Sequence, residues 1–87
     1  MKVERTTFEA EGTQEPCIIV SSDDGYVQVR ISTCYHYIGS NSLYLRETHD
    51  GEYQSSDEYN MPEFCDELDD ITDEEAIALA KESSAYL

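Results

Sequence analysis

The stretch Cys17-Ile-Ile-Val-Ser-Ser-Asp-Asp-Gly-Tyr-Val-Gln-Val-Arg-Ile31 has the pattern of a β-hairpin. Two runs rich in β-branched residues flank Asp24-Gly25, a dipeptide typical of type I′ turns. A two-residue loop at this dipeptide makes one face apolar and the other mostly polar, as an antiparallel pair with one buried face requires. It pairs Val20 with Val29 and Ile18 with Ile31 on the apolar face, and Ile19 with Arg30 and Ser21 with Gln28 on the other.

The chain before this hairpin is less regular. Residues 2–9 can form a strand, although Val3 and Phe8 fall on opposite faces of a strict alternation. Residues 11–16 are polar and contain Gly12 and Pro16, so they are predicted to form a loop.

Two further hairpins are predicted after residue 31. Residues 39–42, Gly-Ser-Asn-Ser, read as a turn, and a bulge near residues 32–34 is then needed to keep the apolar side chains on one face. The resulting pairs are Ile38 with Leu43, His36 with Leu45, Tyr37 with Tyr44 and Tyr35 with Arg46. The third turn is His49-Asp50-Gly51, followed by a short strand at residues 52–55 with Tyr53 opposite Thr48.

The last third of the chain is predicted to be helical in part. Pro62 suits the first turn of a short helix capped by Asn60, with Phe64 and Leu68 four residues apart and packed on the domain. A C-terminal helix over residues 72–86 has a clear start, because Thr72 and Glu75 form the T-x-x-E capping box. Ile71 and Ala76 would form its hydrophobic staple. Its apolar side is rich in alanine, with Ile77 expected as the main anchor.

These elements predict a single α+β domain over residues 1–87. A small antiparallel β-meander of three to five strands, at about residues 2–56, packs against the C-terminal helix at 72–86. An acidic linker or short helix at 57–70 joins them. The chain of 87 residues is long enough for one small core.

Charge is the feature that bears most on function. The formal net charge is −15, and residues 57–82 hold eleven of the twenty carboxylates with Lys81 as their only cation. A compact anion is attracted to basic surfaces, and proteins that handle nucleic acid carry strong ones. Five Lys and Arg against twenty acids argue against direct binding of DNA or RNA.

Motifs for chemistry are missing from the sequence. An EF-hand loop that started at Asp66 or Asp69 would have an aliphatic residue at position 3, where an oxygen ligand is needed, and no glycine at position 6. Cys34, His36, His49 and Cys65 lack the spacing of zinc ligands. No nucleophile motif or phosphate-binding glycine loop occurs. We therefore expect no enzyme activity, no cofactor and no bound metal.

The cysteines and the amino terminus indicate a reducing compartment. Cys17, Cys34 and Cys65 are widely spaced, so reduced thiols are expected rather than a disulfide framework. The first residues contain no apolar signal region, and no run is apolar enough to cross a membrane. The expected location is the cytoplasm.

The sharpest hypothesis is that the carboxylates imitate the phosphates of a nucleic acid and bind the arginines of a partner. Aromatic side chains near them would supply affinity. The candidate partner-binding residues are Asp57, Glu58, Glu63, Asp66, Glu67, Asp69, Asp70, Asp73, Glu74, Glu75, Tyr53 and Tyr59. The simpler alternative is that these charges only keep a small protein soluble.

The chain's size, its acidity and the helix Thr72-Asp-Glu-Glu-Ala-Ile-Ala-Leu-Ala-Lys81 resemble the small phage-encoded anti-CRISPR proteins, particularly those that act as DNA mimics. The resemblance implies a CRISPR effector complex as partner, blocked at its DNA or PAM site, in the cytoplasm of a bacterial host. Two alternatives stay open. One is an immunity protein or antitoxin that neutralises a basic nuclease, and the other is an acidic regulatory domain with an ordinary protein partner.

Overall fold

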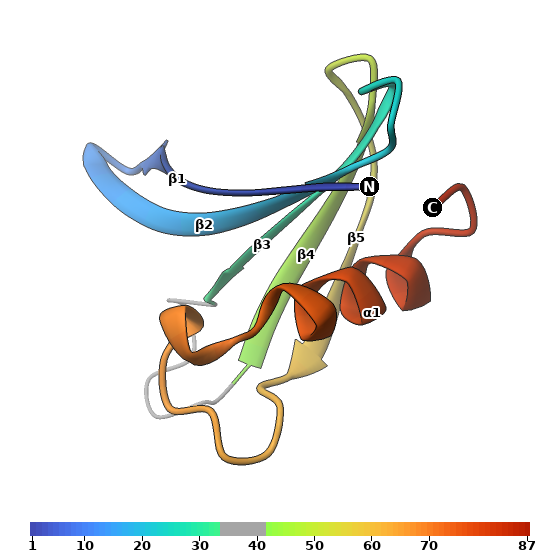
Figure 1. Ribbon diagram of the computed structural model, residues 1–87. Coiled ribbons are helices and arrows are strands. Elements are labelled where there is room, and N and C mark those ends of the chain that lie inside the picture. Colours follow the sequence, from blue (N-terminus) through green and yellow to red (C-terminus); the bar gives the residue numbers. More distant parts are fainter. Residues whose placement is uncertain (34–41) are drawn as a thin grey trace.

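Five antiparallel strands form one sheet in which each strand pairs with the next along the chain (Figure 1). The computed structural model describes residues 1–33 and 42–87. Within these residues a 3-10 turn and one α-helix follow the sheet, which confirms the predicted α+β meander with a C-terminal helix. The elements are β1 (Lys2–Ala10), β2 (Thr13–Ser21), β3 (Val27–Thr33), β4 (Ser42–His49), β5 (Glu52–Asn60), η1 (Leu68–Asp70) and α1 (Asp73–Ser83).

The register predicted for the β2–β3 hairpin is confirmed. Ile18 pairs with Ile31 and Val20 with Val29, so four branched side chains share one face. The turn itself differs from the predicted type I′. Of the turn residues only Gly25 has a positive φ, and its N–H donates to Ser22 O over 2.9 Å, so the turn spans residues 22–25, one residue earlier than predicted. Asp24 stabilises it by accepting from the Ser22 hydroxyl and the Tyr26 N–H.

The predicted loop at residues 11–16 is wrong. Glu11 and Gly12 have φ values of 50° and 83°, the backbone of a type I′ turn, and Ala10 pairs with Thr13 directly beside them. Pro16 therefore lies within β2. It is tolerated there because β3 pairs with β2 only from Ile18 onward, which leaves this part of β2 with β1 as its one partner among the described strands.

The predicted register between the third and fourth strands is also wrong. Leu45 pairs with Ile31, and Leu43 pairs with Thr33, rather than with His36 and Ile38. This register runs without a shift from Val27 to Thr33, so the apolar residues of β3 and β4 share a face with no bulge between residues 32 and 33. The proposed strand residues Tyr35 to Ile38 and the turn at 39–41 lie outside the described residues.

The β4–β5 hairpin confirms the predicted pairing of Thr48 with Tyr53. Asp50 and Gly51 both have positive φ values, as a type I′ turn requires. A bulge lies between Glu47 and Thr48, and β5 continues to Asn60, beyond the predicted end of the sheet at residue 56.

The start of α1 is confirmed in detail. The Thr72 hydroxyl accepts from the Glu75 N–H over 3.1 Å, and the Glu75 carboxylate accepts from the Thr72 N–H over 3.0 Å. The helix ends at Ser83 rather than at residue 86. Ala76 and Ala80 are fully buried while Ile77 is only partly buried, so small alanine side chains, not Ile77, bring the helix close to the sheet.

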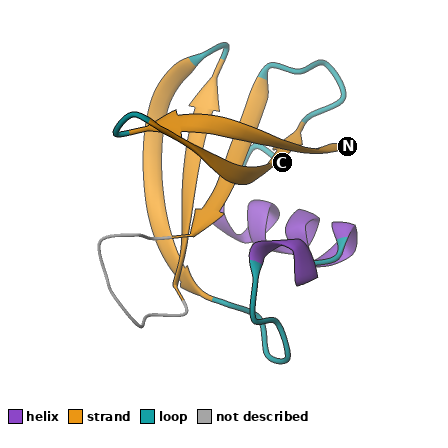
Figure 2. Cartoon of the chain, turned by 90° about the vertical axis from the view of Figure 1, so that its left-hand side faces the viewer, coloured by secondary structure: helices purple, strands orange, loops and turns teal. Residues whose placement is uncertain are grey.

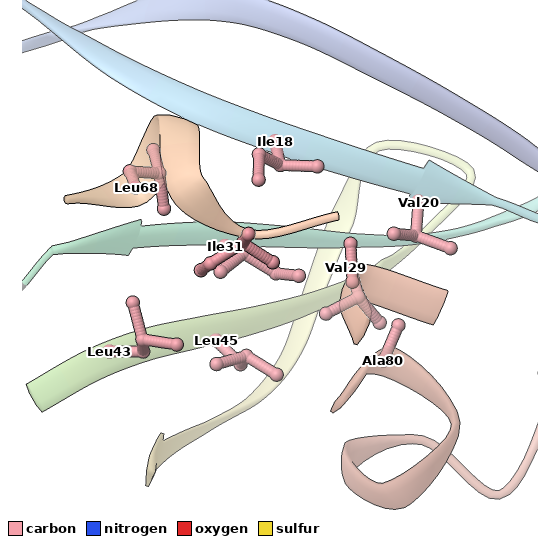
Figure 3. Close-up of a cluster of buried hydrophobic side chains, with 10 residues drawn as sticks. Ile18, Val20, Val29, Ile31, Leu43, Leu45, Leu68 and Ala80 are labelled. Carbon is pink, nitrogen blue, oxygen red and sulfur yellow. The ribbon is translucent and has the colours of Figure 1, made fainter. Parts of the chain in front are cut away.

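The core lies between α1 and one face of the sheet (Figures 1 and 2). Strand side chains and Ala80 point toward one another there, with Leu68 of η1 beside Ile18 (Figure 3). Arg5 on β1 ties the sheet to the start of the helix, since its guanidinium donates to Ile71 O over 2.6 Å and to Asp73 over 3.0 Å. No described helix covers the opposite face of the sheet (Figure 2).

The short helix predicted around Pro62 is wrong. Asn60 ends β5, and residues 62–65 form a single turn closed by the Cys65 N–H on Pro62 O. Phe64 and Leu68 do not share a face: Leu68 is buried, whereas Phe64 is 97% exposed and has a φ of 71°. Leu68 and Ile71, not Phe64, attach the acidic linker to the core.

Candidate functional site

The predicted acidic residues lie on three consecutive segments: the end of β5, the linker of residues 61–67 with η1, and the first turn of α1 (Figure 1). Most of them are exposed. Tyr59 and Glu75 are partly buried, and Tyr53 is 51% exposed at the start of β5. The exposed carboxylates are Asp57, Glu58, Glu63, Asp66, Glu67, Asp69, Asp70, Asp73 and Glu74.

The linker and the helix meet at Cys65. Its thiol lies 3.6 Å from Asp70 O. Burial raises the pKa of the Cys65 thiol, and the charges of Glu75, Asp70 and Asp66 raise it further. Carboxylates from the linker, η1 and α1 therefore gather around one side chain. An anionic environment of this kind also keeps the thiol protonated and unreactive.

The far end of the helix meets β5. Ser83 donates a hydrogen bond of 2.9 Å to the Asp57 carboxylate. Burial raises the pKa of Tyr59, and Asp57 and then Glu82 raise it further. Asp57 of β5 and Glu82 at the end of α1 both act on Tyr59. The contacts at Cys65 and at Ser83 thus connect the predicted acidic segment near the start and at the end of α1.

Three further predicted carboxylates, besides Asp57, have internal partners. Asp70 accepts from the Asp66 and Glu67 N–H groups, both over 3.0 Å. Glu75 caps the Thr72 N–H, and Asp73 forms an ion pair with Arg5. These carboxylates stabilise the starts of η1 and α1, where the helix dipole favours anions. The exposed acids outside these bonds are better candidates for contact with a partner.

Phe64 is the functional candidate that the sequence analysis placed wrongly. A fully exposed phenylalanine with left-handed backbone gives nothing to the fold, since it buries no apolar surface and its φ is unfavourable for a residue with a Cβ. It projects from the linker among Glu63, Asp66 and Glu67. Exposed aromatics surrounded by charge are typical of interface anchors.

A buried polar cluster on β4 was not predicted either. Glu47 is 7% exposed and lies on the core face of the sheet, where it accepts hydrogen bonds from Ser84 over 2.7 Å and from Ser55 over 3.3 Å. His49 Nε2 donates to it over 2.8 Å. Burial alone would raise the pKa of Glu47, but the hydrogen bonds from Ser84, His49 and Ser55 together lower it.

This cluster attaches the end of the helix to the sheet. Ser84 follows α1 directly, and the Tyr86 ring stands edge-on to the His49 ring at 4.9 Å between centroids. His49 was expected to be an isolated turn residue, but it pairs with Glu52 at the end of β4. The Glu47 carboxylate therefore has the hydrogen-bond partners that a buried carboxylate needs.

Metal chemistry finds no support in the described ranges, 1–33 and 42–87, where no three His, Cys, Asp or Glu side chains are arranged to hold an ion. Cys34 and His36 lie outside them. Cys17, expected to be buried and reduced, is a buried free thiol, and Cys65 is also free. Among the same residues no helix has the length and apolar character needed to cross a bilayer. No family model, curated protein or solved structure matches the chain.

Proposed function

We propose that this protein is an inhibitor that binds the basic nucleic-acid-binding site of another protein by presenting carboxylates in place of phosphates. The observation that supports it is the contact between the linker and η1 at Cys65, whose thiol lies 3.6 Å from Asp70 O, with exposed carboxylates on both segments and on the first turn of α1. Guanidinium groups in the partner would bind such carboxylates through paired hydrogen bonds.

Phe64 supplies the apolar component of the proposed interface. Charge complementarity accelerates association, but rim charges in water add little affinity by themselves. A ring that is 97% exposed in the free protein can bury most of its surface in a complex. The proposed contact therefore combines steering by the carboxylates with a single aromatic anchor.

The partner class to test first is a CRISPR effector complex, blocked where it would bind DNA, which makes the protein an anti-CRISPR of the DNA-mimic type. The chain would be tagged and incubated with bacterial lysates and with purified effector complexes at physiological salt. Retention of an effector complex supports the proposal. Retention of one basic nuclease would instead identify an immunity protein or antitoxin. Failure to retain any basic nucleic-acid-binding protein contradicts both.

Charge reversal can locate the interface, provided that internal bonds are left intact. Asp69 and Glu74 are exposed and have no hydrogen bond or ion pair among those found in the described residues, unlike Asp70 and Glu75. Asp69→Lys with Glu74→Lys raises the formal net charge from −15 to −11. Glu9→Lys with Glu11→Lys makes the same change in the β1–β2 hairpin, which serves as a matched control.

A further inference from the structure

The sheet face opposite α1 carries two arginines side by side. Arg30 on β3 pairs directly with Arg46 on β4 and, on its other side, with Ile19 on β2. Alternation along the strands directs these side chains away from the core formed by Ile18, Ile31 and Leu45. Like charges directly opposite one another destabilise a sheet, so folding alone does not account for this pairing.

An aromatic ring holds each guanidinium. Arg30 Cζ lies 3.9 Å from the centroid of the Phe8 ring, and Arg46 Cζ lies 4.7 Å from that of Tyr53. Stacking on a ring fixes the plane of the guanidinium.

The β-bulge between Glu47 and Thr48 makes the second of these contacts possible. Tyr53 and Ser55 are two residues apart and would share a face in a regular strand. The bulge separates them: Tyr53 pairs with Thr48 on the arginine face, while Ser55 reaches Glu47 on the core face. Bulges re-aim side chains in this way beside functional sites.

Within residues 1–33 and 42–87, the ion pairs found do not include Arg30 or Arg46. Both Nε atoms are buried without a hydrogen-bond partner. Burial lowers the pKa of Arg30, and the charge of Arg46 lowers it further. Charged donors are normally paired when they are buried, and both arginines are only partly buried and line one depression, so an anion from outside the chain is the expected partner of their exposed part.

A depression of about 340 Å³ lies over the pair. Gln28 and Thr48, which pair with each other across the same two strands, add neutral hydrogen-bonding groups beside the arginines. Ile19 adds an apolar wall, and Gly51 of the β4–β5 turn completes the lining. The volume falls near the lower end of the roughly 300–1,000 Å³ of small-molecule sites, so a small ligand fits it best.

We propose that this depression binds small phosphate monoesters, with Arg30 and Arg46 holding the phosphate group. A phosphate monoester carries about −1.5 to −2 charges at neutral pH and three acceptor oxygens, which suits two guanidiniums, whereas a carboxylate balances only one. The bonded organic group would lie against Ile19 and accept or donate through Gln28 and Thr48. This site is separate from the acidic surface and does not depend on its function.

Nuclear magnetic resonance tests the proposal through the Nε–H signals of Arg30 and Arg46. Inorganic phosphate, phenyl phosphate and acetate would each be titrated at constant ionic strength. We expect saturable shifts of both signals with either phosphate. Tighter binding of phenyl phosphate identifies a monoester site, and equal binding identifies a site for the phosphate group alone. No saturable shift, or acetate binding as tightly as phosphate, overturns the proposal.

Variants separate the site from general charge effects. Arg46→Gln should weaken phosphate binding by about tenfold or more, the scale of a lost charge-assisted hydrogen bond. Lys81→Gln removes one positive charge from the exposed side of α1 and should leave the affinity unchanged. Arg46→Lys keeps the charge but loses the planar fork, so it should also bind more weakly. Equal affinities of the Arg46 and Lys81 variants would contradict the proposed site.

Discussion

Single residues in this protein carry roles that their neighbours in the sequence do not reveal. Glu47 lies in an alternating strand whose other inward residues, Leu43 and Leu45, are aliphatic, yet it is almost fully buried. Its three hydrogen bonds compensate for burial, and their donors come from three different segments: Ser84 after α1, Ser55 in β5 and His49 at the end of β4. A buried carboxylate placed in this way stabilises the fold only while it is ionised.

The pH dependence of stability tests this role. Because the pKa of Glu47 is lowered in the folded state, its stabilising contribution is present above the ordinary pKa of a glutamate and is lost as the pH falls through the lowered folded pKa. Glu47→Gln should cost on the order of 1–3 kcal/mol at neutral pH, the scale of hydrogen bonds to a charged group. Chemical denaturation of both proteins from pH 7 to pH 3 would show the difference shrinking with acid.

Glu52→Gln is the control for the change in net charge, since Glu52 is exposed at the start of β5. It should cost little at any pH. A free-energy difference between Glu47→Gln and the wild type that stays constant from neutral to acidic pH would contradict the assignment.

Phe64, unlike Glu47, is predicted to contribute to partner binding and not to stability. Phe64→Ala should change the free energy of unfolding by less than about 0.5 kcal/mol, as expected for a side chain with no packing to lose. It should weaken binding of the partner by about tenfold or more, the scale of an interface anchor. Thermal unfolding and affinity measured on the same preparation separate the two effects. A large loss of stability would show that the ring packs on the domain after all.

At the scale of secondary structure, a strand register can be predicted from the sequence only where the turn and the alternation of side chains allow a single pairing. The β2–β3 register was predictable because a glycine turn lies between strands whose alternation agrees on both sides. In the β4–β5 hairpin only the pairs beside the turn were predictable, because a bulge shifts the register beyond Glu47. The β3–β4 register was not predictable. Leu43 and Leu45 point inward whether they meet Thr33 and Ile31 or Ile38 and His36, so alternation alone does not choose between these partners.

The acidic linker shows the same limit. Phe64 and Leu68 have the spacing of one helical face, but the turn at residues 62–65 and the positive φ of Phe64 send the two side chains apart. A local period cannot reveal such a turn. The arginine pair depends on the β3–β4 register, and the contact of Tyr53 with Arg46 depends on the bulge. Neither can be predicted from the sequence, although the arginines are conspicuous cations in an acidic chain.

The helix start gives a prediction at this scale. Thr72→Ala removes the hydroxyl that accepts from the Glu75 N–H, so it should cost about 1 kcal/mol. Thr72→Ser keeps an oxygen in the same place and should cost less. Denaturant midpoints of the two variants with equal slopes would measure this difference. Equal losses for alanine and serine would mean that the hydroxyl does not cap the helix.

The whole molecule is a small domain with a formal net charge of −15, and its charge is uneven. The acids of β5, the linker and α1 lie close enough to act on shared neighbours such as Cys65 and Tyr59. Mutual repulsion among them costs stability and is screened over about 10 Å at 0.1 M salt. The proposed function accounts for this charge by its effect on a partner rather than on the fold.

Salt should therefore stabilise the free protein. A gain of about 1 kcal/mol on going from low ionic strength to roughly 0.15 M would raise Tm by about 4–8 °C for a domain of this size. Scanning calorimetry with sodium chloride gives the value. A Tm that does not change over this range would indicate that the carboxylates are spread too widely to repel one another.

Displacement of DNA from a purified CRISPR effector complex tests the central claim most directly. Labelled target DNA would be bound to the complex at physiological salt and titrated with the wild type, with Asp69→Lys/Glu74→Lys and with Glu9→Lys/Glu11→Lys. We predict that the wild type and the β1–β2 variant displace the DNA, while the variant in η1 and α1 does not. Equal displacement by both variants would place the interface elsewhere, and no displacement by the wild type would contradict mimicry of DNA at that complex.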